Sequence, residues 1–176
     1  IGVTTLGIYQ GLLLAVMLAV LNMLRKSAFP NDAILGIAHD GSVRDMHRPP
    51  KTHEIPGLKI YRFDAPFYFG NANYFRYRVL QIIDKSKEPI HWFLWDAETI
   101  TAIDSTSGQM LLGLIEELRT RDITFAVARM KGSIRTIVHK THRLNSALQH
   151  SPHYSSIGDA IEAYREEYKI SRDYEI

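Results

Sequence analysis

The chain has 176 residues and contains no cysteine. Disulfide bonds, zinc–thiolate sites and thiol nucleophiles are therefore excluded. Acidic and basic residues nearly balance, giving a net charge of +2, and no block of like charges indicates binding to nucleic acid. Hydrophobic residues make up 45% of the sequence, an ordinary value for a globular protein with one sizeable core.

Charged side chains are also missing from one long segment. Residues 1–24 contain no Asp, Glu, Lys, Arg or His, and the apolar run Val3–Leu24 reaches the roughly 20 residues that a helix needs to cross a bilayer. The run is not a signal peptide, because it lacks a basic leading region and a small-residue cleavage site. The alternative is a buried helix of a soluble protein, although such a helix usually carries a polar stripe.

The end of the apolar run indicates its orientation. Arg25 and Lys26 follow it, and positive flanks tend to stay on the cytoplasmic side of a membrane. Pro30 bars continuation of the helix. The first residue is Ile rather than Met, which suggests a piece of a longer protein. We therefore expect a transmembrane segment that ends at residue 26, with the residues after about 26 in the cytoplasm.

Motifs for catalysis, phosphate binding and metal binding are absent. The sequence contains no GxGxxG, GxxxxGK[ST], GxSxG or HExxH pattern. His139 and His142 stand three residues apart, with His150 and His153 beyond them, but no carboxylate lies at a fixed offset to complete a metal site. A solvated helix face explains these histidines better. We expect no enzyme, no cofactor and no bound metal.

Strand and helix patterns alternate from residue 55 onwards. Strands are expected at 58–63, 66–69, 90–95 and 123–128. Helices are expected around four apolar sets: Phe75, Val79, Ile82 and Ile83; Leu111, Leu114, Ile115 and Leu118; Ile134, Ile137 and Val138; and Ile161, Tyr164 and Tyr168. Asn71 is expected to cap the first helix, and Ser156 with Asp159 resembles a capping box for the last. This alternation predicts one α/β domain with a small, mostly parallel sheet.

The second helix is expected to cover the middle of the sheet. We expect its apolar face to form a core with two neighbouring strands, made of Trp92, Leu94, Phe125, Val127, Leu111, Leu114, Ile115 and Leu118. The stretch from Leu35 to Pro56 is polar, rich in His, Pro and Gly, and without periodicity, so it is interpreted as a linker to a domain that starts near Ile55.

A hydroxyl-rich loop opens the second helix. Asp104, Ser105, Thr106 and Ser107 precede Gly108, at a point where free amides and the helix dipole favour an anion. The simpler interpretation is an N-cap. The alternative is a regulatory site, in which a phosphoryl group on Ser105 or Thr106 adds nearly two negative charges beside Asp104. Asp104, Ser107 and Gly108 are then candidates for contact with an anion or a nucleotide.

Two stretches give the chain a family resemblance. The run PGLKIYRFDAPFYFGNA at 56–72 resembles the opening of the STAS domain of SulP-type anion transporters, and the 104–108 loop is similar to the Asp-Ser-Thr/Ser signature of that domain. The resemblance implies a STAS-like α/β fold preceded by an apolar membrane helix. It also implies four parts: the end of the last transmembrane segment (1–26), a linker (27–54), the STAS domain (55–170) and a tail (171–176).

The resemblance implies a function as well. SulP proteins carry sulfate, bicarbonate or related anions, usually as homodimers, and their STAS domain is cytoplasmic and serves assembly and regulation. The expected partners are thus the membrane, the transmembrane domain of the same transporter and a second copy. STAS domains also resemble anti-sigma-factor antagonists, whose phosphorylated serine corresponds to Ser105, and weak nucleotide binding has been proposed for them. The alternative is therefore a signalling module switched by phosphorylation or nucleotide.

Overall fold

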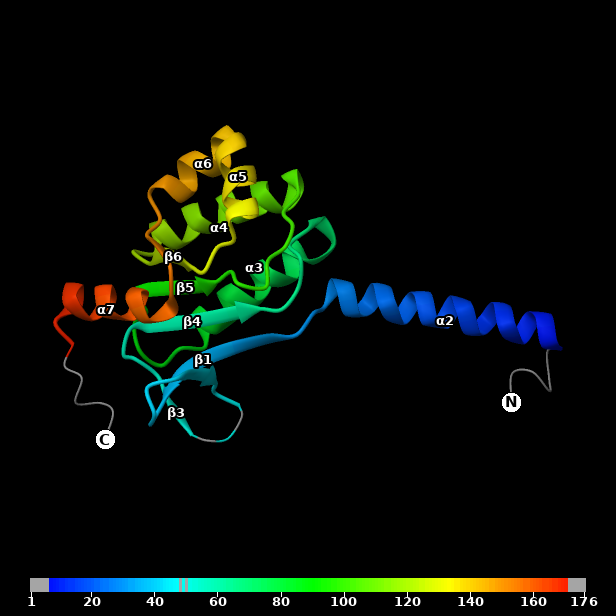
Figure 1. Cartoon of the computed structure of the whole chain (residues 1–176), viewed down its shortest axis with the longest axis horizontal. Coiled ribbons are helices and arrows are strands. Elements are labelled where there is room, and N and C mark those ends of the chain that lie inside the picture. Colours follow the sequence, from blue (N-terminus) through cyan, green and yellow to red (C-terminus); the bar gives the residue numbers. More distant parts are fainter. Residues whose placement is uncertain (1–6, 48, 50, 171–176) are drawn as a thin grey trace.

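The computed structural model describes residues 7–47, 49 and 51–170, and shows a long helix that projects from an α/β domain (Figure 1). The projecting helix, α2, spans Ile8–Ala28 and ends just before Phe29 and Pro30, where the sequence predicts a stop. The helical prediction for Val3–Leu24 is confirmed from Ile8 onwards. Residues 1–6 and the expected tail, 171–176, lie outside the described residues.

The domain is built on a mixed sheet in the order β2-β1-β4-β5-β6-β7, with β3 pairing β1. The strands are β1 (Asp32–Ala38), β2 (Val43–Asp45), β3 (Thr52–His53), β4 (Leu58–Phe63), β5 (Trp92–Asp96), β6 (Thr124–Ala128) and β7 (His153–Tyr154). The four strands from β4 to β7 run parallel, and β1 pairs antiparallel with β2, β3 and β4. The prediction of a mostly parallel α/β sheet is confirmed.

Helices cover both faces of the sheet. Four lie against one face, namely α3 (Phe69–Asp84), α4 (Ser105–Thr120), α5 (Gly132–Lys140) and α6 (His142–Gln149), and α7 (Ile157–Tyr168) covers the other. The first face buries a large core that includes Phe75, Leu114 and Phe125. The second buries a smaller core that includes Leu58, Ile161 and Tyr164. The four helices predicted from the sequence bury most of their apolar positions. Ile137 and Tyr168 are exceptions, since each is 38% exposed.

The core between α4 and the sheet differs from the prediction in one strand. Phe93 and Trp95 of β5, not Trp92 and Leu94, share the core of α4, and they pair in register with Phe125 and Val127. Trp92 and Leu94 pack on the α7 face. Neighbouring strand residues point to opposite faces, and all five residues of β5 are buried. A strand that is covered on both faces therefore shows no alternation of polar and apolar residues. Its sequence then does not indicate which side chains point to which face of the sheet.

The linker expected over 27–54 is wrong for part of that range. Residues 32–38 form β1, which pairs with β4 and buries Leu35 and Ile37. Gly36 interrupts the apolar pattern from which this strand could have been predicted. Glycine is required at this position, because a Cβ atom on it would lie 2.9 Å from the carbonyl oxygen of His53 on β3.

The strand expected at 66–69 is also wrong. Only a single bridge joins Phe67 to Ile103, and α3 begins at Phe69. Tyr68 is the N-cap residue, whereas Asn71 lies one turn into the helix, where its Oδ1 accepts a hydrogen bond from the Tyr68 N–H at 3.1 Å. Asn71 therefore supports the start of the helix from inside it, and does not cap it as predicted.

Candidate functional site: the helix α4 N-terminus and its link to α2

The hydroxyl-rich loop forms the start of α4. Asp104 is the N-cap, and its Oδ1 accepts the Ser107 N–H at 2.7 Å, while Ser107 Oγ accepts the Asp104 N–H at 3.1 Å. This reciprocal pair is a capping box. Ser105 and Thr106 are exposed on the first turn, whereas Ser107 and Gly108 are buried. The prediction that the hydroxyl-rich loop opens the second helix is confirmed, and the side chains of Ser105 and Thr106 lie at the surface.

The cap of α4 also holds the segment that leads into α3. The second carboxylate oxygen of Asp104 accepts the Phe69 N–H at 2.8 Å, and Ser107 Oγ donates to the Phe67 carbonyl at 3.1 Å. Burial alone would raise the pKa of Asp104, but the hydrogen bonds from Ser107 and Phe69 outweigh it, so this pKa lies below its ordinary value. Asp104 is therefore ionised at neutral pH and joins the starts of two helices.

The same segment is fastened to the last turn of α2. The Tyr68 hydroxyl lies 2.6 Å from Ser27 Oγ, and the Asn71 amide donates to the carbonyls of Pro66 at 2.8 Å and Ser27 at 3.4 Å. A second contact is aromatic, since the rings of Phe29 and Tyr74 meet edge to face at 5.3 Å. The base of α2 is thus bound to the first turns of α3.

The chain leaving α2 is fixed to the sheet within a few residues. Asp32 Oδ2 accepts the Tyr61 hydroxyl at 2.9 Å and Arg78 Nε at 2.6 Å, and the Asn31 carbonyl accepts the Asp64 N–H at 3.0 Å. Burial, and then the neighbouring Asp32, raise the pKa of Tyr61, so the hydroxyl remains a donor. The chain on both sides of Phe29 and Pro30 is therefore held by hydrogen bonds to the domain.

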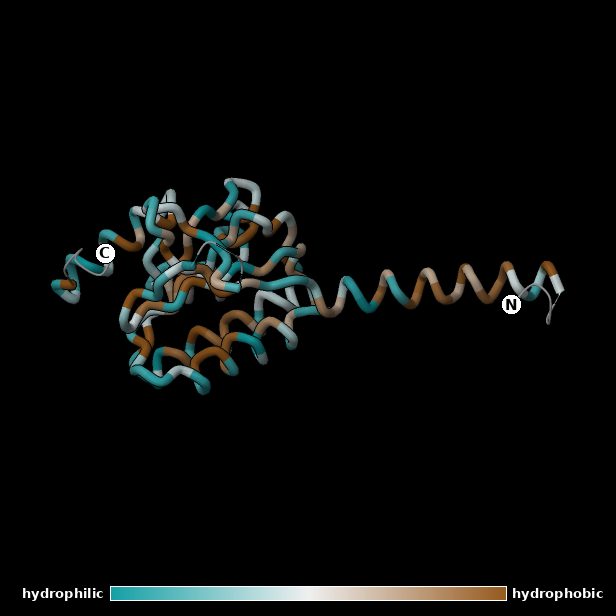
Figure 2. Tube along the Cα trace, turned by 90° about the horizontal axis from the view of Figure 1, so that it is seen from below, coloured by the Kyte–Doolittle hydropathy of each residue, from teal (hydrophilic) through white to brown (hydrophobic). Residues whose placement is uncertain are grey.

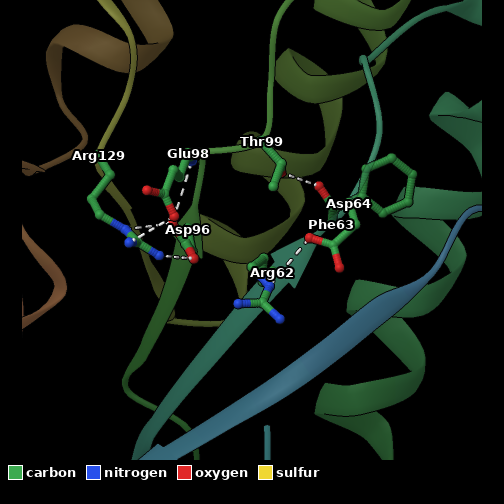
Figure 3. A network of polar contacts seen from close by, with 7 residues as sticks. All are labelled: Arg62, Phe63, Asp64, Asp96, Glu98, Thr99 and Arg129. Carbon is green, nitrogen blue, oxygen red and sulfur yellow. Dashed lines mark hydrogen bonds and ion pairs between the residues drawn. The ribbon is translucent and has the colours of Figure 1, made fainter. Parts of the chain in front are cut away.

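A second polar network lies at the carboxyl ends of the parallel strands (Figure 3). Asp96 is fully buried and pairs with Arg129 through two bonds, Nε–Oδ1 at 3.0 Å and Nη2–Oδ2 at 2.5 Å. Arg129 Nη1 also lies 2.7 Å from Glu98. The backbone of Arg129 is left-handed, with φ of 57°, a conformation that non-glycine residues adopt only where surrounding contacts hold it. Sequence analysis missed this network.

The surface of α2 is mostly apolar, with Gln10 and Asn22 as the polar side chains before Arg25. Its large hydrophobic side chains are all exposed, from Leu14 at 40% to Tyr9 at 86%, and the hydropathy colours of Figure 2 show hydrophobic residues recurring along this helix, outside the domain. The helix is long and apolar enough to cross a membrane by length and composition. Helix α2 meets the domain near the carboxyl end of β4 (Figure 1). The Asp96 network and the start of α4 therefore lie at the end of the sheet that is nearest α2.

The histidines considered as metal ligands, His139, His150 and His153, each contact a different hydrogen-bond partner. His139 Nδ1 lies 2.9 Å from Asn145, His150 Nδ1 lies 2.9 Å from the Ser146 carbonyl, and His153 Nε2 lies 3.0 Å from the Leu148 carbonyl. The side chain of His142 lies outside the described residues. Among the residues that the structure describes, no group of three or more His, Asp or Glu side chains is placed to hold a metal ion.

Comparison with known proteins gives consistent matches. A family model described as the STAS domain matches residues 49–160. A probable sulfate transporter of Mycobacterium tuberculosis is 34% identical over 161 residues, covering 91% of this chain and 29% of that protein. A sulfate transporter of Arabidopsis thaliana, numbered 3.1, is 24% identical over 172 residues, covering 93% of this chain and 26% of its own length. The chain thus spans less than a third of these relatives, which are named as transporters, not enzymes.

Solved structures agree on the fold. The murine Slc26a9 anion transporter in its inward-facing state superposes with a TM-score of 0.78 at 19% identity, covering 89% of this chain and 25% of that one. The STAS domain of a SulP transporter from Vibrio cholerae gives 0.53 at 18% identity, covering 68% of this chain and 89% of that one. The first match covers more of this chain than the second, which comes from an isolated domain.

Proposed function

Since this chain belongs to the STAS-domain family, in the form that SulP and SLC26 sulfate transporters carry, we propose that it is the cytoplasmic regulatory and assembly domain of a membrane anion transporter. In this proposal α2 is the end of the last transmembrane helix, and the residues after about 26 lie in the cytoplasm. The transported anion is sulfate or bicarbonate, and the partners are the transmembrane domain of the same protein and a second copy.

One observation carries the regulatory part of this proposal. The base of α2 is fastened to α3 through Ser27, Tyr68 and Asn71, and α3 is fastened to α4 through Asp104. A force or displacement at the start of α4 therefore has a hydrogen-bonded route to the end of the membrane helix. Energetic coupling between sites is carried by networks of packed and hydrogen-bonded groups, and this proposal assigns that role to these contacts.

The direct test is anion uptake by the full-length transporter. Labelled sulfate and bicarbonate are offered to a transport-deficient host that expresses either the natural protein or the Tyr68→Phe variant. The variant loses only the hydroxyl that meets Ser27, so we expect changed uptake with unchanged amounts of protein in the membrane. Tyr77→Phe, an exposed tyrosine further along α3, is the matched control. Equal uptake by all three proteins would contradict the regulatory role.

A second candidate function is a phosphorylation- or nucleotide-switched module of the anti-sigma-factor-antagonist type. The observation in its favour is that Ser105 and Thr106 are exposed at the helix start, whereas both oxygens of Asp104 are already engaged. A phosphoryl group on either hydroxyl is favoured by the helix dipole and repelled by Asp104. That repulsion would weaken the Asp104–Phe69 bond, so the switch would act on the link to α2.

The switch is tested by modification in vitro. Incubation of the chain with the cell's kinases and labelled ATP, followed by peptide mapping, is expected to label Ser105 or Thr106. Absence of label on both, while the protein is transport-active, would leave the domain as an assembly element.

A further inference from the structure

A hollow lies on the side of the domain formed by α5, α6 and β7. It has a volume of about 430 Å³, and its floor includes the apolar side chains of Met130, Val138 and Leu148. Its polar lining consists of Arg135, His139, Asn145, Gln149, His153, Tyr154 and Ser155. All of these side chains can donate a hydrogen bond. No carboxylate is present among the described residues that line the hollow.

Three of the lining groups carry or can acquire positive charge. Arg135 and His139 come from α5, and His153 comes from β7. Burial lowers the pKa of His153, the bond to the Leu148 carbonyl raises it, and the nearby Arg135 and His139 lower it further. Like charges held together without a counter-charge are unfavourable in the empty protein. They become favourable when a negatively charged group binds between them.

The hydrogen bonds of the two histidines determine which protonation state can bind. The Leu148 carbonyl only accepts, so His153 Nε2 carries the hydrogen and Nδ1 is the remaining nitrogen. His139 Nδ1 is likewise engaged with Asn145 Oδ1, which leaves Nε2. In a neutral imidazole the remaining nitrogen is an acceptor, and protonation converts it into a donor. Each histidine therefore offers the hollow a donor only in its charged form.

Among the described side chains that line the hollow, no neighbour of His153 carries a negative charge. Its neighbour Tyr154 has a pKa raised by burial and by Glu167 of α7, so its hydroxyl stays neutral. The described lining side chains from α6 are uncharged, namely Asn145, Leu148 and Gln149. Met130, which follows β6 in the chain and also lines the hollow, is uncharged as well.

We propose that this hollow binds a doubly charged tetrahedral oxyanion, either free sulfate or phosphate or the end of a phosphomonoester, held by Arg135 and protonated His153 together with the ring of His139. For sulfate, which stays doubly charged, binding is then linked to proton uptake by the protein and strengthens as the pH falls. A phosphomonoester itself takes up a proton at a pH of about 6, which opposes this trend. The site is separate from the α4 start, and its existence does not depend on transport.

Titration of the 176-residue chain in detergent tests the site. Sulfate is the main probe because it stays doubly charged over the whole range from pH 5 to 8, and the histidine ring signals are followed by NMR. Arg135, His139 and His153 are exposed, and contacts with such side chains predict a dissociation constant of about 1–10 mM at low pH. Above the histidine pKa the affinity is expected to fall by about tenfold per pH unit for each coupled proton. Chloride at equal ionic strength is the control for screening.

Variants identify the groups responsible. Arg135→Gln is expected to weaken sulfate binding by about fivefold or more, while Arg76→Gln, an exposed arginine of α3, leaves it unchanged. His153→Gln keeps a donor for the Leu148 carbonyl but cannot be protonated, so it is expected to flatten the pH dependence. Methyl phosphate is titrated in parallel, and a preference for it over sulfate assigns the hollow to phosphomonoesters. Equal shifts with chloride, or equal affinities for Arg135→Gln and Arg76→Gln, would overturn the proposal.

Discussion

Helices α2 and α4 are both rich in leucine, but only α4 has a packed face. Leu111, Leu114 and Leu118 of α4 recur at helical spacing and are fully buried, whereas Leu12 and Leu13 of α2 are 62% and 68% exposed. A helix whose surface is mostly apolar needs an apolar surrounding, such as lipid or other membrane helices. The α/β domain thus completes its own core, and α2 depends on the membrane that we propose around it.

Removal of α2 is the largest test of this difference. A chain that begins at Asn31 keeps β1 and both cores, so we expect a soluble domain with native far-ultraviolet circular dichroism. A chain that begins at Ile55 lacks β1, and it exposes the edge of β4 and the apolar surface beneath Leu35 and Ile37. We expect this second chain to aggregate or to lose most of its stability. Equal solubility and stability of the two would mean that β1 is dispensable.

A pair of leucine substitutions measures the two environments directly. Leu114→Ala leaves a cavity in the core beneath α4 and is expected to lower the free energy of unfolding by about 2–5 kcal/mol. Leu18→Ala, on the exposed surface of α2, is expected to change the stability of the domain by less than about 0.5 kcal/mol. Denaturant titration of the chain in detergent, followed by tryptophan fluorescence, gives both values. Similar losses for the two would show that α2 is part of the domain's cooperative fold.

The contrast also explains what could be predicted from the sequence. The apolar run, the α4 leucine stripe and the Ser156–Asp159 capping box are local patterns, and local patterns determine helices and their ends. The orientation of Trp92 and Leu94 could not be read, because β5 is buried on both faces. The Asp96–Arg129 pair depends on residues 33 positions apart that only the sheet register brings together. The sequence offered one indication of this pair, namely the aspartate at the end of an apolar strand.

The link between the domain and α2 can be separated from the stability of the domain. Asp104→Ala removes the cap of α4 and the bond to Phe69, and Ser156→Ala removes the cap of α7, which lies on the opposite face. Each is expected to cost about 0.5–2 kcal/mol. In the full-length transporter, however, only Asp104→Ala is expected to change anion uptake. If the two variants change uptake equally, the effect arises from lost stability and not from the link.

The same variant has a defined pH dependence. The pKa of Asp104 is lower in the folded protein than in the unfolded chain, so its contribution to stability is present above the unfolded pKa and is lost as the pH falls through the folded value. The difference in unfolding free energy between the natural chain and Asp104→Ala is therefore expected to be constant near neutral pH and to shrink in acid. A difference that grows in acid would show that the carboxylate is not the stabilising form.

The smallest expected effect on stability, and the most informative one for function, is at Ser105. Its side chain is exposed and it follows the cap instead of forming it, so Ser105→Ala is expected to change stability by less than about 0.5 kcal/mol. Ser105→Asp places a second carboxylate beside Asp104 at the helix start, where the dipole favours it and Asp104 repels it. We expect this variant to stay folded and to alter uptake by the full-length carrier, in the same direction as Asp104→Ala, because both weaken the hold on Phe69. Thr106→Ala and Thr106→Asp form the matched pair one residue further along. If all four substitutions leave uptake unchanged while Asp104→Ala changes it, the link to α2 is real but no switch operates at these hydroxyls.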